Sequence, residues 1–310
     1  MAFLKDSVFK GRLIADAVSY IRKFSGETIV IKIGGSALSD PQKIKNFALD
    51  VVMLKNCGID VIVIHGIGSH IDRILDKFGR KQSVVENVRV STKEDIELIE
   101  MIISGHINKQ IVQEINFAGG VGVGLSGKDA SLITAAKMRR TKKETDSNIE
   151  RLVDFGYLGS PKKINTEIFE ILSDSPVIPV ISPVGFDEYG NTYTINADNV
   201  AGAIASAVRA NRLVLMTESD GLIGEDGSLI SSLSRLEAES LRKSRVIKGS
   251  SLAKLDVCIE ALKGGVFGAH MINSKLEHSL LIEMLTKERM GTFIFNNEAN
   301  FTNEDFEFED

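Results

Sequence analysis

The chain has 310 residues, of which 43% are hydrophobic and 25% charged, and its formal net charge at pH 7 is −5. These values are ordinary for a globular protein of one large domain or two lobes. The acidic balance, without a basic stripe, excludes nucleic acid as the main partner, and no apolar stretch is long enough to cross a membrane. Cys57 and Cys258 lack metal-ligand spacing, and no signal-peptide h-region occurs, so a reducing, cytoplasmic location is expected.

An amphipathic helix is the first element that the sequence predicts, over residues 8–24. Apolar side chains recur there at helical spacing, while basic side chains occupy the other faces. The apolar set is Leu13, Ile14, Ala17, Val18, Ile21 and Phe24. The helix has no core of its own, so it packs either on the rest of its own domain or on another subunit.

The next two predicted strands both end in glycine. The first, over residues 28–33, carries one cation, Lys32, and the second covers residues 61–65. The glycines that follow them are Gly34, Gly35, Gly66 and Gly68. Glycine has no Cβ to keep an anion away from backbone N–H groups. Side by side, the two strand ends would form a phosphate cradle, although each alone is equally well explained as a tight strand-to-helix turn.

Strands and helices continue to alternate along the chain. Helical patterns are predicted near residues 41–56, 70–78, 92–117, 196–210, 252–264 and 278–286. Strands or hairpin arms are predicted near residues 175–186, 212–217, 221–230 and 269–273. Residues 130–138 fit either a helix or a strand, and the charged segment 141–150 predicts an exposed loop or a hairpin tip. The helix near residue 196 is expected to be capped by Asn196 or Asp198.

This alternation predicts an α/β fold with a mostly parallel central sheet sandwiched by helices. A shift in composition near residues 173–179 divides the fold into two lobes. The expected parts are an N-terminal helix over residues 1–25 as a possible oligomerisation element, lobes over residues 26–175 and 176–296, and an acidic flexible tail over residues 297–310.

Residues 122–128 contain glycines that nearly match two phosphate-binding motifs. Gly122, Gly124 and Gly127 fit G-x-G-x-x-G, and the same stretch approaches a P-loop. However, Asp129 stands where a P-loop needs Ser or Thr, and the glycines follow a long helix rather than the first strand of a βαβ unit. We therefore interpret the run as a tight backbone crossing inside a lobe or at an interface.

Four other polar residues each have a functional and a plainer interpretation. His65 fits a general base or, more simply, a side chain that hydrogen-bonds a loop. Asp198 fits a reactive acid or a helix cap, while Lys254 and Arg89 fit ordinary surface cations as well as ligands of an anion. No paired-histidine motif or G-x-S-x-G elbow occurs, so neither a protein-bound metal nor serine hydrolysis has support.

The order of several segments resembles the amino acid kinase superfamily and, within it, the N-acetylglutamate kinase family. From about residue 15 to residue 294 the segments follow the family's order, as YIRKFSGETIVIKIGG, DVVMLKNCGIDVIVIHG, VGLSGKDASLI, TYTINADNVAGAIA, HMIN and GTFI. The resemblance implies ATP-dependent phosphorylation of the side-chain carboxylate of N-acetyl-L-glutamate, a step of arginine synthesis. It also implies that the first lobe binds the acceptor and the second binds ATP.

The resemblance implies a role for each matching residue. Lys32 and Lys254 would grip the transferring phosphoryl group, and Asp198 would lie between them and orient both. The acceptor would be held by Gly66, Ile67, Gly68, Arg89 and Asn196, with backbone N–H groups of the glycines as donors. The nucleotide would contact Gly34, Gly35, Thr217, Glu218, Gly221 and Lys254, and would carry Mg²⁺ on its phosphates. A carboxylate acceptor is already ionised at pH 7, so no general base is required.

Several positions depart from the family's pattern, among them Ile33 and the loop over residues 249–253, and they leave alternatives open. Ile67 and Ser36 stand where the family usually has Gly and Asn, and Glu218 replaces an aspartate. One alternative is a kinase of the same fold with another acceptor, such as N-acetylaminoadipate, a carrier-bound amino acid or a small phosphate. The other is a nucleotide-binding regulatory homologue with little turnover.

The N-terminal helix resembles that of the arginine-inhibited, hexameric branch of the family. Parts of that branch's arginine site are matched by Tyr20, His270, Glu288 and Gly291. Arg289 and Met290 replace its glycine and isoleucine, and a fixed guanidinium would repel arginine. We therefore expect a homo-oligomer, either a dimer or a hexamer, with weak or altered arginine feedback.

Overall fold

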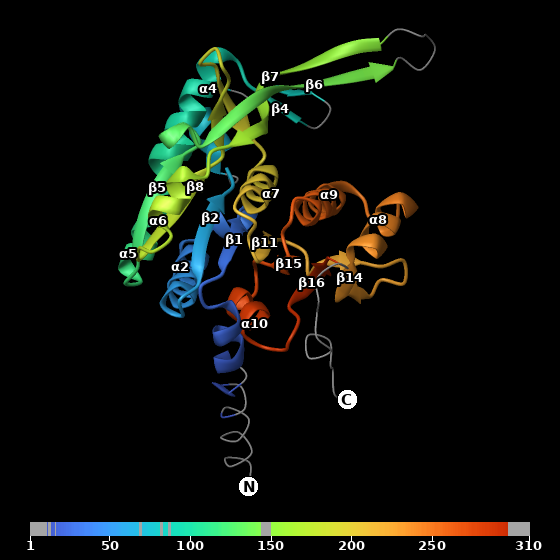
Figure 1. Cartoon of the computed structure of the whole chain (residues 1–310). Coiled ribbons are helices and arrows are strands. Elements are labelled where there is room, and N and C mark those ends of the chain that lie inside the picture. The colour runs from blue at the N-terminus through green and yellow to red at the C-terminus, as the bar shows by residue number, and fades with distance from the viewer. Residues whose placement is uncertain are drawn as a thin grey trace.

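The computed structural model describes residues 17–67, 70–80, 83–85, 88–143 and 150–296, together with residues 11, 14 and 15. At its centre lies an eight-stranded sheet (Figure 1). Its strands are, in spatial order, β14 (Ser232–Ser234), β16 (Gly291–Phe295), β15 (Gly268–Asn273), β11 (Arg212–Thr217), β1 (Thr28–Ile33), β2 (Asp60–His65), β8 (Val177–Ser182) and β5 (Val121–Ser126). All neighbours are parallel except β15 and β16, which confirms the predicted fold class.

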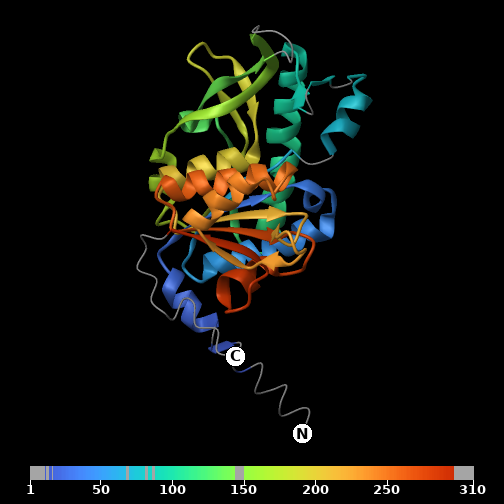
Figure 2. The same ribbon diagram turned by 90° about the vertical axis from the view of Figure 1, so that its right-hand side faces the viewer.

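Two layers of helices cover the sheet, because β1 alternates its apolar side chains between two separate core clusters. One face packs against α2 (Pro41–Asn56), α3 (His70–Lys77), α4 (Lys93–Glu100), the π-helix η2 (Met101–Ile107), α5 (Asn108–Phe117) and α10 (Ser279–Leu285). The other face packs against α6 (Glu167–Leu172), α7 (Ala197–Ala207), α8 (Arg235–Ser244) and α9 (Gly249–Lys263). Helices α7 and α9 lie side by side over this second face (Figure 2).

A closed four-stranded barrel stands beside the sheet. It is formed by β6 (Ile133–Lys143), β7 (Glu150–Ile164), β9 (Val184–Phe186) and β10 (Thr192–Ile195). The ambiguous segment 130–138 is thus mostly strand. β6 and β7 form a long antiparallel hairpin that projects from the body (Figure 1). The predicted hairpin tip is consistent with the last pair, Lys143 with Glu150, while residues 144–149 lie outside the described part.

The remaining elements are short. They are η1 (Gly35–Ser39), β3 (Ser83–Val85), β4 (Val88–Val90), η3 (Asp129–Ser131), β12 (Leu222–Ile223) and β13 (Leu229–Ile230). β3 pairs with β4, and β12 pairs with β13, each as an antiparallel hairpin. The second of these hairpins confirms the one predicted over residues 221–230.

The long helix predicted over residues 92–117 exists, but it is interrupted. Its isoleucine stripe is buried throughout, as the periodicity predicts; Ile96, Ile99, Ile103, Ile107, Ile111 and Ile115 are at most 3% exposed. Between α4 and α5 the chain widens into the π-helix η2. Such single turns are often found at functional sites, and this one delivers Asn108 to the buried side of α5, where it is 1% exposed.

Most of the glycine run lies in the strand β5, at one edge of the sheet. A Cβ added to Gly124 would overlap Asn108 and Lys109, and one added to Gly127 would overlap the carbonyl oxygen of Val184. The tight packing expected of this segment is therefore observed, although its strand structure was not predicted. Glycine lets α5 approach the edge strand closely.

The described part of the N-terminal helix packs on the chain's own core, and the strands on the two sides of the predicted lobe boundary pair with each other. Residues 17–24 are helical, Phe24 is buried, and Ala17, Tyr20 and Ile21 pack against the first core cluster. β8, β9 and β10, which follow the predicted boundary at residue 175, pair with strands that precede it. The division into lobes stays a prediction. This strand pairing would place the boundary between the lobes after residue 195. The acidic tail lies outside the described residues.

Candidate active site

The carboxyl ends of β1 and β2 bring the two glycine-bearing turns together. Ile33 is paired with His65, and the N–H of Gly66 donates to the carbonyl oxygen of Ile33 at 2.7 Å. A Cβ on Gly66 would lie 3.3 Å from the Cα of Gly34, and one on Gly34 would lie 2.8 Å from Nζ of Lys32. The bare backbone therefore leaves room beside the Lys32 ammonium group. In this structure the N–H of Gly66, a predicted anion donor, is bonded to Ile33.

Lys32, Asp198 and Lys254 converge on one point. Nζ of Lys32 lies 2.8 Å from Oδ1 of Asp198, and Nζ of Lys254 lies 2.9 Å from Oδ2 of the same carboxylate. The side chains of Lys32 and Asp198 are 10% exposed and that of Lys254 is 16% exposed. Residues far apart in the sequence thus form one buried ion triad, which we call the Lys–Asp–Lys triad.

Each member of the triad is held by a rigid element. Lys32 lies in β1, at the centre of the sheet, and Asp198 lies in the first turn of α7. The side-chain oxygen of Asn196 caps α7 by accepting from the N–H of Asp198 at 2.8 Å and that of Asn199 at 3.4 Å. This confirms Asn196 as the predicted cap. Lys254 lies on α9, which packs against α7.

The two ammonium groups decide the charge state of Asp198. Burial alone would raise the pKa of this carboxyl group, but the charges and hydrogen bonds of Lys32 and Lys254 outweigh burial and hold its pKa below the ordinary value. The triad therefore contains one negative and two positive charges. Its surplus positive charge can bind an anion.

Apart from Lys254 on α9, the residues predicted to contact a nucleotide lie in or beside two adjoining turns. Gly35 has a φ of +60°, and a Cβ there would lie 2.5 Å from Oε1 of Glu218. Oγ1 of Thr217 donates to the carbonyl oxygen of Ser219 at 2.7 Å and accepts from its N–H at 3.0 Å, which shapes the turn after β11. Gly221, with a φ of +136°, continues that turn. Gly35 and Glu218 therefore adjoin each other near Lys32.

The predicted acceptor-binding residues are only partly described. Asn196 is exposed, and its cap uses the oxygen of its amide. Ile67 is half-buried and packs against the first core cluster. Arg89 lies on β4, paired with Val84, but its side chain and the whole of Gly68 lie outside the described part of the chain.

His65 is a buried loop-bonding residue, as the plainer interpretation holds. It is fully buried; its Nδ1 lies 2.9 Å from the carbonyl oxygen of Gly66, and its Nε2 lies 3.2 Å from Nδ2 of Asn108. Burial lowers the pKa of His65 to about 4, against the hydrogen bond to Gly66. Asn108 was not selected from the sequence, since a lone asparagine in an isoleucine-rich helix carries no motif.

The predicted regulatory residues surround a second charged cluster. Nδ1 of His270 lies 2.7 Å from Oε1 of Glu283, and the N–H of Met290 donates to Oε2 of Glu283 at 2.6 Å. The Arg289 guanidinium reaches to 3.7 Å from the same carboxylate and lies 4.8 Å from the ring centre of Phe293. Burial lowers the pKa of His270 to about 4, although Glu283 opposes this shift.

Glu283 is the carboxylate that contacts His270, and Glu288, one of the predicted regulatory residues, is exposed. A signal for Glu283 was present, because it is the one acid within the apolar run LLIEML. Tyr20 stacks on Phe24, which in turn lies 5.0 Å below the Arg212 guanidinium. Gly291 begins β16, beside this cluster.

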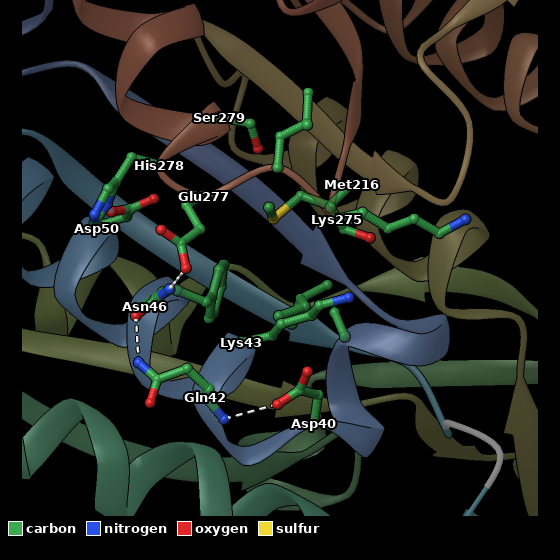
Figure 3. Close-up of a pocket in the computed structure, with 15 residues that line it drawn as sticks. Asp40, Gln42, Lys43, Asn46, Asp50, Met216, Lys275, Glu277, His278 and Ser279 are labelled. Atoms are coloured by element: carbon green, nitrogen blue, oxygen red, sulfur yellow. Dashed lines mark hydrogen bonds and ion pairs between the residues drawn. The ribbon is translucent and has the colours of Figure 1, made fainter.

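A cavity of about 120 Å³ lies on the sheet face opposite α7 and α9 (Figure 3). Asn46 of α2 donates to Glu277 at 3.2 Å, and Asp50 of α2 lies 2.6 Å from Nδ1 of His278. Burial raises the pKa of Asp50, although His278 opposes this shift. None of the predicted site residues lines this cavity. The contacts of Asn46 with Glu277 and of Asp50 with His278 connect α2 to the segment before α10.

Within the described ranges, no helix is both long and apolar enough to span a bilayer. In the same part of the chain, no group of three or more His, Cys, Asp or Glu side chains could hold a metal ion.

Comparison with known sequences identifies close relatives of the chain. A sequence model of the amino acid kinase family matches residues 27–273. The acetylglutamate kinase of Parvibaculum lavamentivorans is 42% identical over 285 residues, which cover 92% of this chain and 94% of that protein. The acetylglutamate kinase of Ehrlichia chaffeensis is also 42% identical, over 93% of this chain and 90% of that protein.

Solved structures share the fold. N-acetylglutamate synthase from Neisseria gonorrhoeae, complexed with coenzyme A and N-acetyl-glutamate, matches with a TM-score of 0.77 and 26% identity over 93% of this chain. The chain spans only 63% of that synthase. The same synthase complexed with coenzyme A and L-arginine matches with a TM-score of 0.73 and 25% identity, over 91% of this chain and 64% of that one. Carbamate kinase from Giardia lamblia, at 14% identity and a TM-score of 0.62 over 88% of this chain and 99% of its own, is similar in fold alone.

The Asp198 carboxylate gives a stability prediction with a defined sign. Because its folded-state pKa lies below the ordinary 3.8, the ionised carboxylate stabilises the folded state at and above pH 4, and this contribution is lost as the pH falls through the lower, folded-state pKa. Asp198→Asn leaves two buried ammonium groups without their counter-ion. We expect it to lower the free energy of unfolding by about 3–5 kcal/mol at pH 7, measured by urea denaturation.

The control for this measurement is Asp154→Asn, which breaks a surface ion pair with Lys137 and should change the stability little. The difference between wild type and Asp198→Asn should shrink as the pH falls from 7 to 3. Equal stabilities at pH 7, or a difference independent of pH, would contradict the assigned charge state.

Proposed function

This chain belongs to the amino acid kinase family, and from that premise we propose that it transfers the γ-phosphoryl group of ATP to the side-chain carboxylate of N-acetyl-L-glutamate. The Lys–Asp–Lys triad is the observation that carries the proposal, because it supplies the charges that this transfer requires. The relatives named acetylglutamate kinase match more than nine-tenths of the chain at about 40% identity. A different acceptor, or a regulatory role without turnover, is not favoured.

The reaction is a displacement at phosphorus. One oxygen of the acceptor carboxylate forms a bond to the γ-phosphorus, the bond from that phosphorus to the bridging oxygen breaks, and ADP leaves. The products are an acyl phosphate and ADP, and no proton changes place, since the acceptor is already ionised. Catalysis of such a step depends on alignment and on neutralising charge.

The triad residues provide that neutralisation. Lys32 stands beside the bare backbone of Gly34, and Lys254 approaches from α9, so that two ammonium groups flank one space. We assign to both lysines the stabilisation of the negative charge on the transferring group. Asp198 holds the two ammonium groups in place and limits their mutual repulsion.

The two substrates would approach from opposite sides. We assign the nucleotide to Gly34, Gly35 and the turn after β11, which comprises Thr217, Glu218 and Gly221. We assign the acceptor to Gly66, Ile67 and Gly68, together with Arg89 and Asn196. The two oxygens of Asp198 lie 2.8 and 2.9 Å from the ammonium nitrogens of Lys32 and Lys254. Mg²⁺ would accompany ATP on its phosphate oxygens, where it neutralises phosphate charge.

The edge strand β5 supports a homo-oligomer. It has a described neighbour, β8, on one side only, and exposed apolar side chains occur on it and on the adjoining η2 and α5. These are Met101, Phe117, Val121 and Val123, which are 37–73% exposed. An apolar edge strand without charged residues pairs readily with another chain. We propose that two copies of the chain associate through this edge of the sheet, in the cytoplasm.

Activity tests the proposed function directly. Incubation of the protein with ATP and N-acetyl-L-glutamate should release ADP and form an acyl phosphate that hydroxylamine traps. Lys32→Ala and Lys254→Ala should each lower kcat by about 100- to 1,000-fold, because each removes a charge that faces the transition state. Lys263→Ala, at the exposed end of the same helix as Lys254, should not. Hydroxamate formation no greater than that of Lys254→Ala would remove N-acetylglutamate as the acceptor.

Light scattering tests the association. The protein should have at least twice the mass of its 33.8 kDa chain. Val123→Lys places a charge on the exposed edge and should shift the particle toward a smaller species. Leu236→Lys is the matched control, since Leu236 is 56% exposed on α8, which contacts β14 at the opposite edge of the sheet. A wild-type monomer, or an unchanged mass for Val123→Lys, would contradict this interface.

Arg289 leads to a prediction about feedback. The guanidinium of Arg289 already lies near Glu283 and Phe293. The guanidinium of a bound L-arginine would therefore be repelled by Arg289 and could not make the same contacts. We expect millimolar L-arginine to inhibit the wild-type enzyme weakly and to inhibit Arg289→Gly more strongly. Lys287→Gly, an exposed neighbour, should behave as wild type. Strong inhibition of the wild type, unchanged by Arg289→Gly, would contradict the assignment.

A further inference from the structure

We propose that His65 and Asn108 form a positioning pair, which fixes the peptide between Gly66 and Ile67 so that the N–H of Ile67 serves as an anion donor beside Lys32. The inference rests on the proposed function, because it assigns to the pair a part in aligning the transferred group. Neither residue would touch the substrates. Both would act through the backbone of the Gly66–Ile67 turn.

The hydrogen bonds of Asn108 determine which nitrogen of His65 carries the proton. Nζ of Lys109 donates to one amide atom of Asn108 at 3.2 Å, which makes that atom the oxygen. The other amide atom donates to the carbonyl oxygen of Val180 at 2.9 Å, which makes it the nitrogen. This nitrogen lies 3.2 Å from Nε2 of His65. An amide nitrogen only donates, so Nε2 accepts, and the proton of the neutral ring is on Nδ1.

The protonated Nδ1 then fixes a peptide plane. It donates to the carbonyl oxygen of Gly66 at 2.9 Å. In a trans peptide the C=O and the following N–H point in opposite directions. The N–H of Ile67 therefore points away from the buried imidazole ring. Within the described part of the chain it has no backbone acceptor, whereas the N–H of Gly66 is bonded to Ile33.

The same geometry brings this turn next to the triad. A Cβ on Gly66 would lie 3.9 Å from Cε of Lys32 and 3.3 Å from Cα of Gly34. The side chain of Ile67 packs against the core cluster. A branched residue is thus compatible with the turn, because its backbone N–H, rather than its side chain, faces the anion. This accounts for isoleucine at a position where glycine was expected.

The glycine run supports the pair from a distance. A Cβ on Gly124 would overlap Oδ1 of Asn108, and the carbonyl oxygen of Gly124 accepts from Nζ of Lys109 at 3.1 Å. The π-helix η2 ends at Ile107, directly before Asn108. The run at residues 122–128 is thus linked to the transfer site through Asn108 and Lys109.

The tautomer is the first test, and it requires no turnover. In the full-length protein, ¹⁵N-edited NMR of the histidine rings, assigned with His65→Asn, should show His65 neutral, protonated on Nδ1 and unprotonated on Nε2 throughout pH 6–8. Burial keeps its pKa near 4. A ring protonated on Nε2, or one that titrates with the ordinary pKa of 6.5, would overturn the inference even if the enzyme is active.

Two substitutions of His65 then separate positioning from packing. Asparagine places its amide nitrogen where Nδ1 lies and can still donate to Gly66, whereas glutamine places it where Nε2 lies. We expect His65→Gln to lower kcat by about 10- to 100-fold with little change in the KM for ATP, and His65→Asn to retain most of the activity. Both lose the imidazole ring, so equal losses in kcat, or a larger loss for His65→Asn, would overturn the proposal.

Two substitutions on the other side of the pair complete the experiment. Asn108→Asp offers an acceptor in place of the donor, so the NMR signals should show a proton on Nε2 and kcat should fall as in His65→Gln. Gly124→Ala should lower kcat by displacing Asn108, whereas Gly105→Ala, which meets nothing within 4 Å, should not. An unchanged ring tautomer in Asn108→Asp would overturn the pairing. The absence of turnover in the wild type would instead contradict the proposed function.

Discussion

One buried carboxylate holds two ammonium groups, and the rest of the site depends on this interaction. Two unit charges of the same sign a few ångströms apart repel strongly where water is scarce. Asp198 lies 2.8 Å from one ammonium nitrogen and 2.9 Å from the other, so it offsets that repulsion. The cluster keeps a net positive charge, which allows it to bind an anionic group that is being transferred. An uncompensated lysine pair would instead lose protons or separate.

The fold supplies the rigidity that this arrangement requires. β1 is flanked by hydrogen-bonded strands on both sides, so the position of Lys32 is fixed by the sheet. Asp198 is fixed by the Asn196 cap of α7, and Lys254 is fixed by the packing of α9 on α7. The turns that we assign to the two substrates lie at the carboxyl ends of parallel strands, the usual position for sites in open α/β sheets.

Much of this could be predicted from the sequence, for identifiable physical reasons. Apolar periodicity located the long helices and central strands, and the segment order predicted that Lys32, Asp198 and Lys254 belong to one site, where the structure does bring them together. The barrel was not predicted, because its strands pair with partners far away in the chain. Asn108 and Glu283 were missed as well, since their importance arises from buried contacts with His65 and His270 that no local pattern reveals. The need for glycine near residue 124 also arises from a tertiary contact, the close packing of α5 against β5.

The most direct test of the central claim is a crystal structure of the protein with a non-hydrolysable ATP analogue and N-acetyl-L-glutamate. The account predicts that the γ-phosphoryl group and the acceptor carboxylate face each other between Lys32 and Lys254, with both ammonium groups within hydrogen-bond distance of phosphate oxygens. A complex in which the γ-phosphoryl group lies elsewhere, with the triad closed and without contact to it, would contradict the account.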